Sequence, residues 1–222
     1  MVTPTARELG PGRFTWNPDM TRGIQAGGSL YSTLYWLTPE GIEPMDVTLS
    51  NGDKKWSLAD TLIIARTPTL SITDYDLGVA HGPAWSPDGR TIAFFASPEA
   101  IGKRGQSRVT GQYHLYLMDP ITLEPTPALD NLYFPGNPYW SPDNRWIVLQ
   151  AYVGESGSKG LWLFSVDSGD LYLIAKGEFN GFLWSQDGQE IIAVHCLNQD
   201  VPSCQDTEIV KYDVRQFVLG TE

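Results

Sequence analysis

The sequence of 222 residues predicts an all-β protein built from four-stranded antiparallel units, and three observations carry this prediction. A short motif led by tryptophan returns several times along the chain. A run rich in β-branched and aromatic residues follows each copy, as in a β-strand. A further pair of strand-like runs then completes each unit.

The repeated motif has the composition of a tight turn. Its clear copies are WSPDG at 85–89, WSPDN at 140–144 and WSQDG at 184–188, and a worn copy, WNPDM, stands at 16–20. Serine bonds to the local backbone, proline presets φ, aspartate suits the third position, and glycine or asparagine tolerates the left-handed conformation that follows. We therefore expect hairpin corners with these structural turn residues: Asp88, Gly89, Asp143, Asn144, Asp187 and Gly188.

The runs after each motif supply the other strands in order. Isoleucine stands seven residues after each clear tryptophan, at Ile92, Ile147 and Ile191, inside runs such as TIAFFAS and WIVLQAY. A second hairpin follows each of them, in YHLYLMDPITLEP, GLWLFSVDSGDLYLI and TEIVKYDVRQFVLG, and STLYWLTPEGIEP follows the first copy in the same way. Every unit is thus expected to contain a strand, a tight turn, a second strand and a further hairpin.

The spacing of the units indicates a β-propeller. The four tryptophans, together with Trp56 in the degenerate stretch KKWSLADTLIIA, stand 42 residues apart on average. A period of about 40 residues with four strands per repeat is typical of propeller blades, which bury one another's faces. Because the step from Trp56 to Trp85 is short for a blade, Trp56 belongs either to a fifth blade or to an insertion. We expect four or five blades in one domain that covers residues 1–222.

At these residues the chain resembles the TolB-like, WD-related propeller repeats, which join a Trp-Ser-Pro-Asp-Gly corner to an aliphatic strand and an LYL-D strand. The resemblance covers about residues 14–30 and 80–220, and it departs at Met20, at Gln186 and over residues 44–80. It implies contact with proteins, and similar blades also occur in prolyl-oligopeptidase-type peptidases. Such propellers usually have about six blades. Either a small ring closes with residues 2–10 as the outer strand of its last blade, or the chain is part of a larger propeller.

The composition excludes some classes of function. The formal net charge of −11 argues against a general nucleic-acid binder, because affinity for phosphates requires a basic face. No apolar run reaches the roughly 18 residues of a membrane-spanning helix, so we expect no membrane span. The first residues, MVTPTARELGPGRF, lack the basic and apolar regions of a signal peptide.

The two cysteines bear on the cellular compartment. Cys196 and Cys204 flank the loop LNQDVPS between two strand-like runs, where a disulfide can join the two arms of a hairpin. Two reduced cysteines that lie near each other by chance are the alternative. A disulfide implies an oxidising compartment, so we expect an extracytoplasmic location, periplasmic or secreted.

No catalytic or metal-binding motif is visible in the sequence. Asp88, Asp143 and Asp187 are expected to be turn residues that a ring of blades holds apart, whereas paired catalytic carboxylates or calcium ligands must converge. The stretch GESGSKG lacks the register of a nucleophile elbow. The three histidines, His81, His114 and His195, form no ligand pair. We therefore predict no catalytic residues, no metal and no cofactor.

Candidate binding residues lie in two kinds of loop. One kind joins neighbouring blades, the other joins the two middle strands of a blade, and both emerge at the same end of a propeller. Loops held on a rigid scaffold are where binding residues concentrate. Aromatic residues and one basic cluster fall there, and His81 precedes an inner strand. The candidates are Tyr75, His81, Lys103, Arg104, Arg108, Tyr133, Phe134 and Phe179. The alternative is an ordinary solvated loop end.

Three functions remain open on the sequence. The first hypothesis is a noncatalytic scaffold that presents this loop-rich end to a protein partner or to a glycan. The second is a propeller hydrolase or lyase, or the accessory propeller of a peptidase whose catalytic domain lies elsewhere. The third is a structural subunit of a larger assembly whose neighbours complete the ring.

Overall fold

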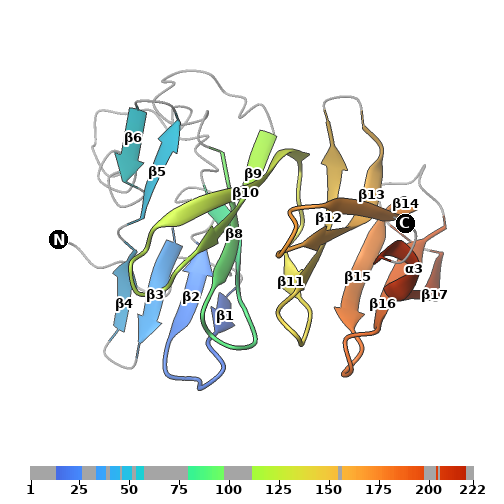
Figure 1. The fold of residues 1–222 in the computed structure, drawn as a ribbon, viewed down its shortest axis with the longest axis horizontal. Coiled ribbons are helices and arrows are strands. Elements are labelled where there is room, and N and C mark those ends of the chain that lie inside the picture. The colour runs from blue at the N-terminus through green and yellow to red at the C-terminus, as the bar shows by residue number, and fades with distance from the viewer. Residues whose placement is uncertain are drawn as a thin grey trace. The chain divides into compact units, whose positions relative to one another are not determined.

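The computed structural model describes residues 14–26, 34–38, 41–45, 47–51, 54–57, 80–97, 112–154, 157–197, 204 and 206–218. The chain forms two compact units, residues 1–132 and 133–222. Within the described residues nearly all regular structure is antiparallel strand (Figure 1), as the runs of β-branched and aromatic residues predict.

The first unit begins with a four-stranded sheet. Its strands are β1 (Phe14–Trp16), β2 (Gly23–Ala26), β3 (Leu34–Thr38) and β4 (Gly41–Pro44), paired in chain order. A two-stranded ribbon follows, formed by β5 (Thr48–Asn51) and β6 (Lys54–Ser57). Trp56 lies in this ribbon, opposite Leu49, so the structure places the degenerate fifth copy outside any four-stranded sheet of the described residues.

A second sheet of the first unit starts at the next tryptophan. It contains β7 (Ala80–Trp85), β8 (Ile92–Ala96), β9 (Gln112–Met118) and β10 (Pro125–Tyr133), hydrogen-bonded in chain order. Side chains of both sheets form one core: Ile24 and Leu34 come from the first sheet, and Ile92, Phe94 and Tyr116 from the second. The two sheets are therefore neighbouring blades that bury each other's faces.

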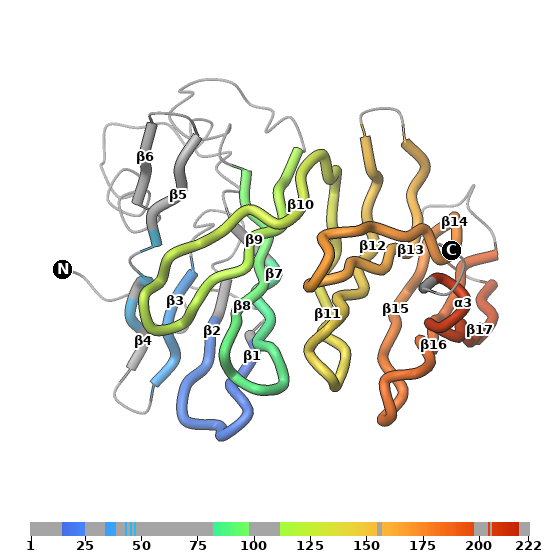
Figure 2. The backbone as a smooth tube through the Cα atoms, in the orientation of Figure 1, coloured from blue at the N-terminus to red at the C-terminus, as the bar shows by residue number. Residues whose placement is uncertain are grey.

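The second unit repeats this arrangement. One sheet contains β11 (Tyr139–Trp140), β12 (Trp146–Val153), β13 (Lys159–Ser165) and β14 (Leu171–Lys176). The other contains β15 (Phe179–Trp184), β16 (Glu190–Cys196) and β17 (Thr207–Asp213), and the short helix α3 (Arg215–Val218) follows it. Figure 2 traces the tight corners between β11 and β12 and between β15 and β16.

Tryptophan joins the two sheets of the second unit. Trp184 packs against a core that includes Val148 and Leu163 of one sheet and Ile191 of the other. Its indole Nε1 donates a hydrogen bond of 3.0 Å to the backbone carbonyl of Tyr139. Trp184, like Trp85 in the first unit, thus packs between sheets, as aromatic residues with one polar atom commonly do.

These sheets are the blades of a β-propeller, and the predicted fold class is confirmed. Among the described residues, each of the four tryptophan motifs joins the first two strands of an antiparallel group, and these groups are β1–β4, β7–β10, β11–β14 and β15–β17. Residues 2–10, predicted as one candidate for a further outer strand, lie outside the described part of the chain. No helix in the described part is long and apolar enough to cross a membrane.

Candidate functional site

The four tryptophan motifs fold into one repeated turn. In the copy at Trp85, the Ser86 hydroxyl donates to Asp88 Oδ1 (2.7 Å) and accepts from the Thr91 backbone N–H (2.9 Å). The Asp88 carboxylate also accepts the Arg90 backbone N–H at 3.1 Å. The copies at Trp140 and Trp184 repeat all three bonds. The repeated aspartates are therefore occupied in holding the turn.

The last position of each turn has the left-handed conformation. The φ angles are 59° at Met20, 71° at Gly89, 64° at Asn144 and 69° at Gly188. Glycine adopts this conformation without steric cost and asparagine at low cost, whereas methionine is strained there. The serine hydrogen bonds lower the pKa of Asp88 and of Asp187, because they stabilise the ionised carboxylate.

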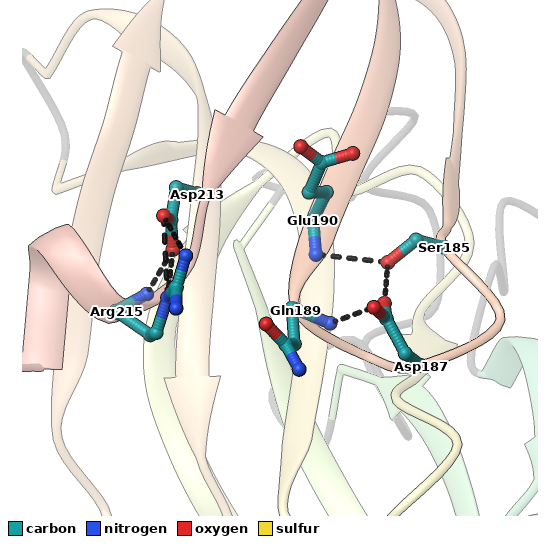
Figure 3. A network of polar contacts seen from close by, with 6 residues as sticks. All are labelled: Ser185, Asp187, Gln189, Glu190, Asp213 and Arg215. Atoms are coloured by element: carbon teal, nitrogen blue, oxygen red, sulfur yellow. Dashed lines mark hydrogen bonds and ion pairs between the residues drawn. The ribbon is translucent and has the colours of Figure 1, made fainter.

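A second polar contact lies beside the Trp184 turn (Figure 3). Arg215, at the start of α3, donates to both carboxylate oxygens of Asp213, at distances of 2.9 Å and 2.6 Å. These hydrogen bonds lower the pKa of Asp213. The pair fixes the end of β17 to the following helix, which accounts for both charges without a ligand.

The opposite end of the second unit has a different character, and we call it the loop end. It consists of the segments around Phe134, at the β12–β13 connection, at the β14–β15 connection and after β16. Phe134 is 72% exposed and has a φ angle of 48°, in the left-handed region. Its ring lies edge-on to Tyr152, with ring centroids 6.3 Å apart.

Charged and polar side chains continue this surface. The Lys159 ammonium lies 6.0 Å from the centroid of the Tyr152 ring and forms an ion pair with Glu178 at 2.7 Å. The Gln150 side-chain oxygen accepts the backbone N–H of Phe179 at 2.6 Å. These contacts tie the β12–β13 connection to the β14–β15 connection.

Histidine and the disulfide complete the loop end. The ring of His195 stacks on Phe179, with centroids 4.8 Å apart, and its Nδ1 lies 3.2 Å from Glu208 Oε1. Cys196 forms a disulfide with Cys204, as predicted, and their Cα atoms are 5.5 Å apart. The disulfide closes the loop that leaves β16.

The predicted binding residues differ in position and in exposure. Phe134 is exposed and Tyr133 is half-buried at the end of β10. His81 lies in β7, where its backbone is opposite Phe95. The expectation that Phe179 adds surface area is wrong: the side chain is 5% exposed, because it packs into the core between the two sheets. Tyr75, Lys103, Arg104 and Arg108 lie outside the described residues.

Three residues of the loop end were missed by the sequence reasoning. Tyr152, Lys159 and Glu178 lie at or beside strand ends, and none of them is among the predicted binding residues. The alternation of side chains along a strand does not indicate which strand ends lie close together. The sequence therefore contains no signal that these three residues are neighbours.

The loop end combines several kinds of chemical group. No three His, Cys, Asp or Glu side chains among them gather closely enough to hold a metal ion. The loop end instead combines an exposed aromatic ring, a cation and carboxylates on a disulfide-closed scaffold. Aromatic residues are enriched at protein interfaces, and the rim of an interface is polar.

Comparison with known proteins agrees with the fold. No protein-family model matches the chain. Over 122 residues, 54% of its length, the chain is 30% identical to the uncharacterized peptidase YuxL of Bacillus subtilis (strain 168), and the match covers 17% of that protein.

Solved structures resemble the chain over most of its length. A putative TolB from Agrobacterium tumefaciens gives a TM-score of 0.58 at 18% identity, over 92% of this chain and 60% of that one. TolB from Acinetobacter baumannii gives 0.54 at 16% identity, over 93% and 42%. An oligogalacturonate lyase in complex with manganese gives 0.56 at 12% identity, over 92% and 50%. The chain spans less than two thirds of each of these proteins, and its fold is that of a TolB-like β-propeller.

Proposed function

We propose that the chain is a noncatalytic binding scaffold that presents its loop end to a protein partner outside the cytoplasm. The observation that carries this proposal is Phe134, a large aromatic residue that is 72% exposed and has a φ angle of 48°. A non-glycine residue in the left-handed region costs about 1–2 kcal/mol. Strain kept at an exposed position favours a functional role for that residue.

The surroundings of Phe134 suit a protein interface. Tyr152 supports the ring from the side, and the ion pair of Lys159 with Glu178 lies next to Tyr152. An aromatic residue that is held in place before binding loses little side-chain entropy when a partner covers it. Aromatic anchors surrounded by polar groups are the usual energetic centres of interfaces.

The disulfide supports the extracytoplasmic part of the proposal. Cys196 and Cys204 are bonded in the structure, and such bonds persist mainly in oxidising compartments. A location in the periplasm or outside the cell is consistent with this bond.

A second candidate function rests on two of the comparisons. The relative YuxL is described as a peptidase, and this chain matches 17% of its length. One of the similar structures is an oligogalacturonate lyase, so the second candidate function includes binding of a glycan. Under this alternative the chain is the accessory propeller of a peptidase, or a lyase. A third proposal is a structural subunit of a larger assembly.

The direct test is partner capture with a matched control. Tagged wild-type protein and the Phe134→Ser variant are incubated with an extracytoplasmic extract, and bound proteins are quantified by mass spectrometry. We expect Phe134→Ser to lower the amount of a specific partner at least tenfold without changing the melting temperature. Ile121→Ser, at a position that is 89% exposed in the first unit, should leave capture unchanged. Equal capture by all three proteins would contradict the role of Phe134.

The basic residues of the stretch 97–112 provide a second test. Replacing Lys103, Arg104 and Arg108 with serine should keep the free energy of unfolding within about 0.5 kcal/mol of wild type, as for most surface changes. We expect weaker binding of the captured partner and a smaller dependence on salt. Equal affinities of wild type and the triple variant at low and at high salt would exclude these three residues from the interface.

The enzymatic alternative is tested separately. Purified protein is incubated with oligogalacturonate and Mn²⁺, and the unsaturated product of a lyase is followed by its ultraviolet absorbance. Turnover that depends on protein concentration would replace the scaffold proposal with a lyase. We expect no turnover.

A further inference from the structure

One position of the repeat differs between the last blade and the two before it. The residue eleven positions after the tryptophan of a clear motif is Ala96 in one sheet and Ala151 in the next, and both are 0% exposed. In the sheet β15–β17 the same position holds His195. The last blade thus places a titratable ring where the other two have a buried methyl group.

His195 lies between a ring and a carboxylate from the two neighbouring strands. Directly paired residues of adjacent strands share a face of the sheet, and His195 is paired with Phe179 of β15 and with Glu208 of β17. Its ring stacks on Phe179 with centroids 4.8 Å apart, and its Nδ1 lies 3.2 Å from Glu208 Oε1. Because Phe179 belongs to the core between the sheets of the second unit, His195 covers the edge of that core at the loop end.

The hydrogen-bonding groups around the ring favour its neutral form. An ionised carboxylate only accepts hydrogen bonds, so Nδ1 carries the proton of the neutral ring and Nε2 carries the lone pair. Nε2 is buried and has no hydrogen-bond partner among the described residues. Protonation would place a charged N–H at this buried atom without an acceptor, which costs more than an unpaired lone pair.

The contacts that favour the protonated ring are weaker. The Glu208 side chain is 50% exposed, and ion pairs with exposed carboxylates contribute little. A cation stacked on a phenylalanine ring also gains only a small attraction. Of the other charged groups at this end, Glu178 and Lys159 pair with each other at 2.7 Å, and Lys176 and Asp206 are exposed and opposite in charge. The buried N–H without an acceptor therefore decides the balance against a protonated ring in the packed position.

Two backbone N–H groups beside His195 report on this packing. The Cys196 N–H donates to the Glu178 carbonyl at 2.8 Å, and the Phe179 N–H donates to the Gln150 side-chain oxygen at 2.6 Å. Phe179 loses its stacking partner when the ring of His195 leaves. The strand ends that these two hydrogen bonds hold are then free to separate more often.

We propose that His195 is a pH-dependent switch at the loop end. When the ring is neutral, it packs on Phe179 and joins β15 to β17. When the ring is protonated, it turns into solvent and the strand ends around it open. Histidine is the side chain that commonly changes its charge between about pH 5 and pH 8. Because the open position binds a proton more readily than the packed position, a falling pH favours opening.

This inference concerns the fold and does not depend on a partner at the loop end, so its test needs the protein alone. Amide hydrogen exchange is measured by NMR without reductant, and the rates are corrected for the intrinsic effect of pH. From about pH 8 to about pH 5.5, the protection of the Phe179 and Cys196 amides should fall about tenfold in wild type. The Ser185 amide, which donates to the Glu190 carbonyl at the turn end of the same sheet, should keep its protection.

Two variants at the switch give opposite expectations. His195→Gln keeps a donor toward Glu208 and does not titrate, so the protection of the Phe179 amide should be independent of pH. Glu208→Gln keeps an acceptor for Nδ1 and removes the ion pair, so opening should begin at a higher pH than in wild type. His114→Gln is the matched control, because His114 of the first unit also has a buried Nε2 without a partner among the described residues. It should leave the pH dependence at Phe179 unchanged.

Each outcome supports or overturns the proposal. Protection of the Phe179 amide that stays constant or rises in wild type as the pH falls overturns it, as does an unchanged pH dependence in His195→Gln. If His195→Gln does not fold, the Cε1 proton of His195 in wild type replaces the variant, because its resonance follows the charge of the ring. Titration of this resonance without loss of protection over the same pH range would also overturn the proposal.

Discussion

The second unit has a turn end, which carries the motifs at Trp140 and Trp184, and a loop end on the same strands. The two ends differ in how far apart in the sequence their hydrogen-bonded residues lie. At the turn end, the copies at Trp140 and Trp184 share the same three serine and aspartate hydrogen bonds, which join residues two or five positions apart. At the loop end, the Lys159–Glu178 bond spans 19 residues and the Phe179–Gln150 bond spans 29. Neither bond has a counterpart of the same residues in the neighbouring blade.

This difference separates the residues that specify the fold from those that are free to specialise. A turn whose hydrogen bonds are local can be copied from blade to blade, because it depends on few surroundings. A loop end depends on which strand ends meet, and its residues can change without loss of the blade. We therefore expect mutations at the turn end to act on stability and mutations at the loop end to act mainly on binding.

The largest expected effect comes from breaking a turn. Gly188→Val forces a β-branched residue into a φ of 69°, and the new Cβ would lie 3.3 Å from Pro142 Cδ. We expect a loss of about 3 kcal/mol in the free energy of unfolding, measured by urea denaturation. Gly188→Asn should cost far less, because Asn144 has the same position in the preceding blade. A valine variant as stable as wild type would contradict this account of the turn.

Removal of the disulfide should be the next largest effect, and it tests the loop end. The bond links residues eight positions apart, so the Cys196→Ala/Cys204→Ser double variant should lose about 2 kcal/mol of stability through the freer unfolded chain. Thermal unfolding with and without the bond measures this loss. Mass spectrometry without reductant should show the wild type two hydrogens lighter than the reduced chain. Two freely alkylated thiols in protein from its native compartment would argue against an oxidising location.

Met20→Gly should improve the worn copy of the turn. Met20 is 66% exposed and has a φ of 59°, so glycine removes strain and sacrifices little packing. We expect a gain of about 1 kcal/mol, seen as a higher urea midpoint. Met20→Ala is the control, because it shortens the side chain and keeps the strain. If both variants have the same stability, strain at this turn is negligible.

The smallest expected effect is a change in acid sensitivity. The Ser185 hydrogen bond lowers the folded-state pKa of Asp187 below its ordinary value of 3.8. Its stabilising contribution is therefore present above pH 3.8 and is lost as the pH falls through the lower folded-state pKa. Urea midpoints between about pH 2 and pH 5 should fall less steeply for Asp187→Asn than for wild type. Identical slopes would mean that Asp187 has the same pKa in the folded and unfolded states.

The amino-acid sequence by itself determined the blades and their corners. Serine, aspartate and glycine or asparagine define the turn within six residues, and strand alternation follows from local composition. The disulfide was also predictable, because both cysteines flank one hairpin loop. These features depend on neighbours in the chain, which the sequence displays directly.

Only the tertiary structure decided which side chains meet beyond the hairpins. Phe179 begins β15 and Phe134 directly follows β10, so both lie at strand ends, yet Phe179 is 5% exposed and Phe134 is 72% exposed. Their burial depends on whether an adjacent blade covers them, and a period-2 pattern carries no information about that cover. Ile209 and Leu161 show the same contrast: each is paired with the residue ten positions after the tryptophan of its sheet, yet Ile209 is 75% exposed and Leu161 is 0% exposed.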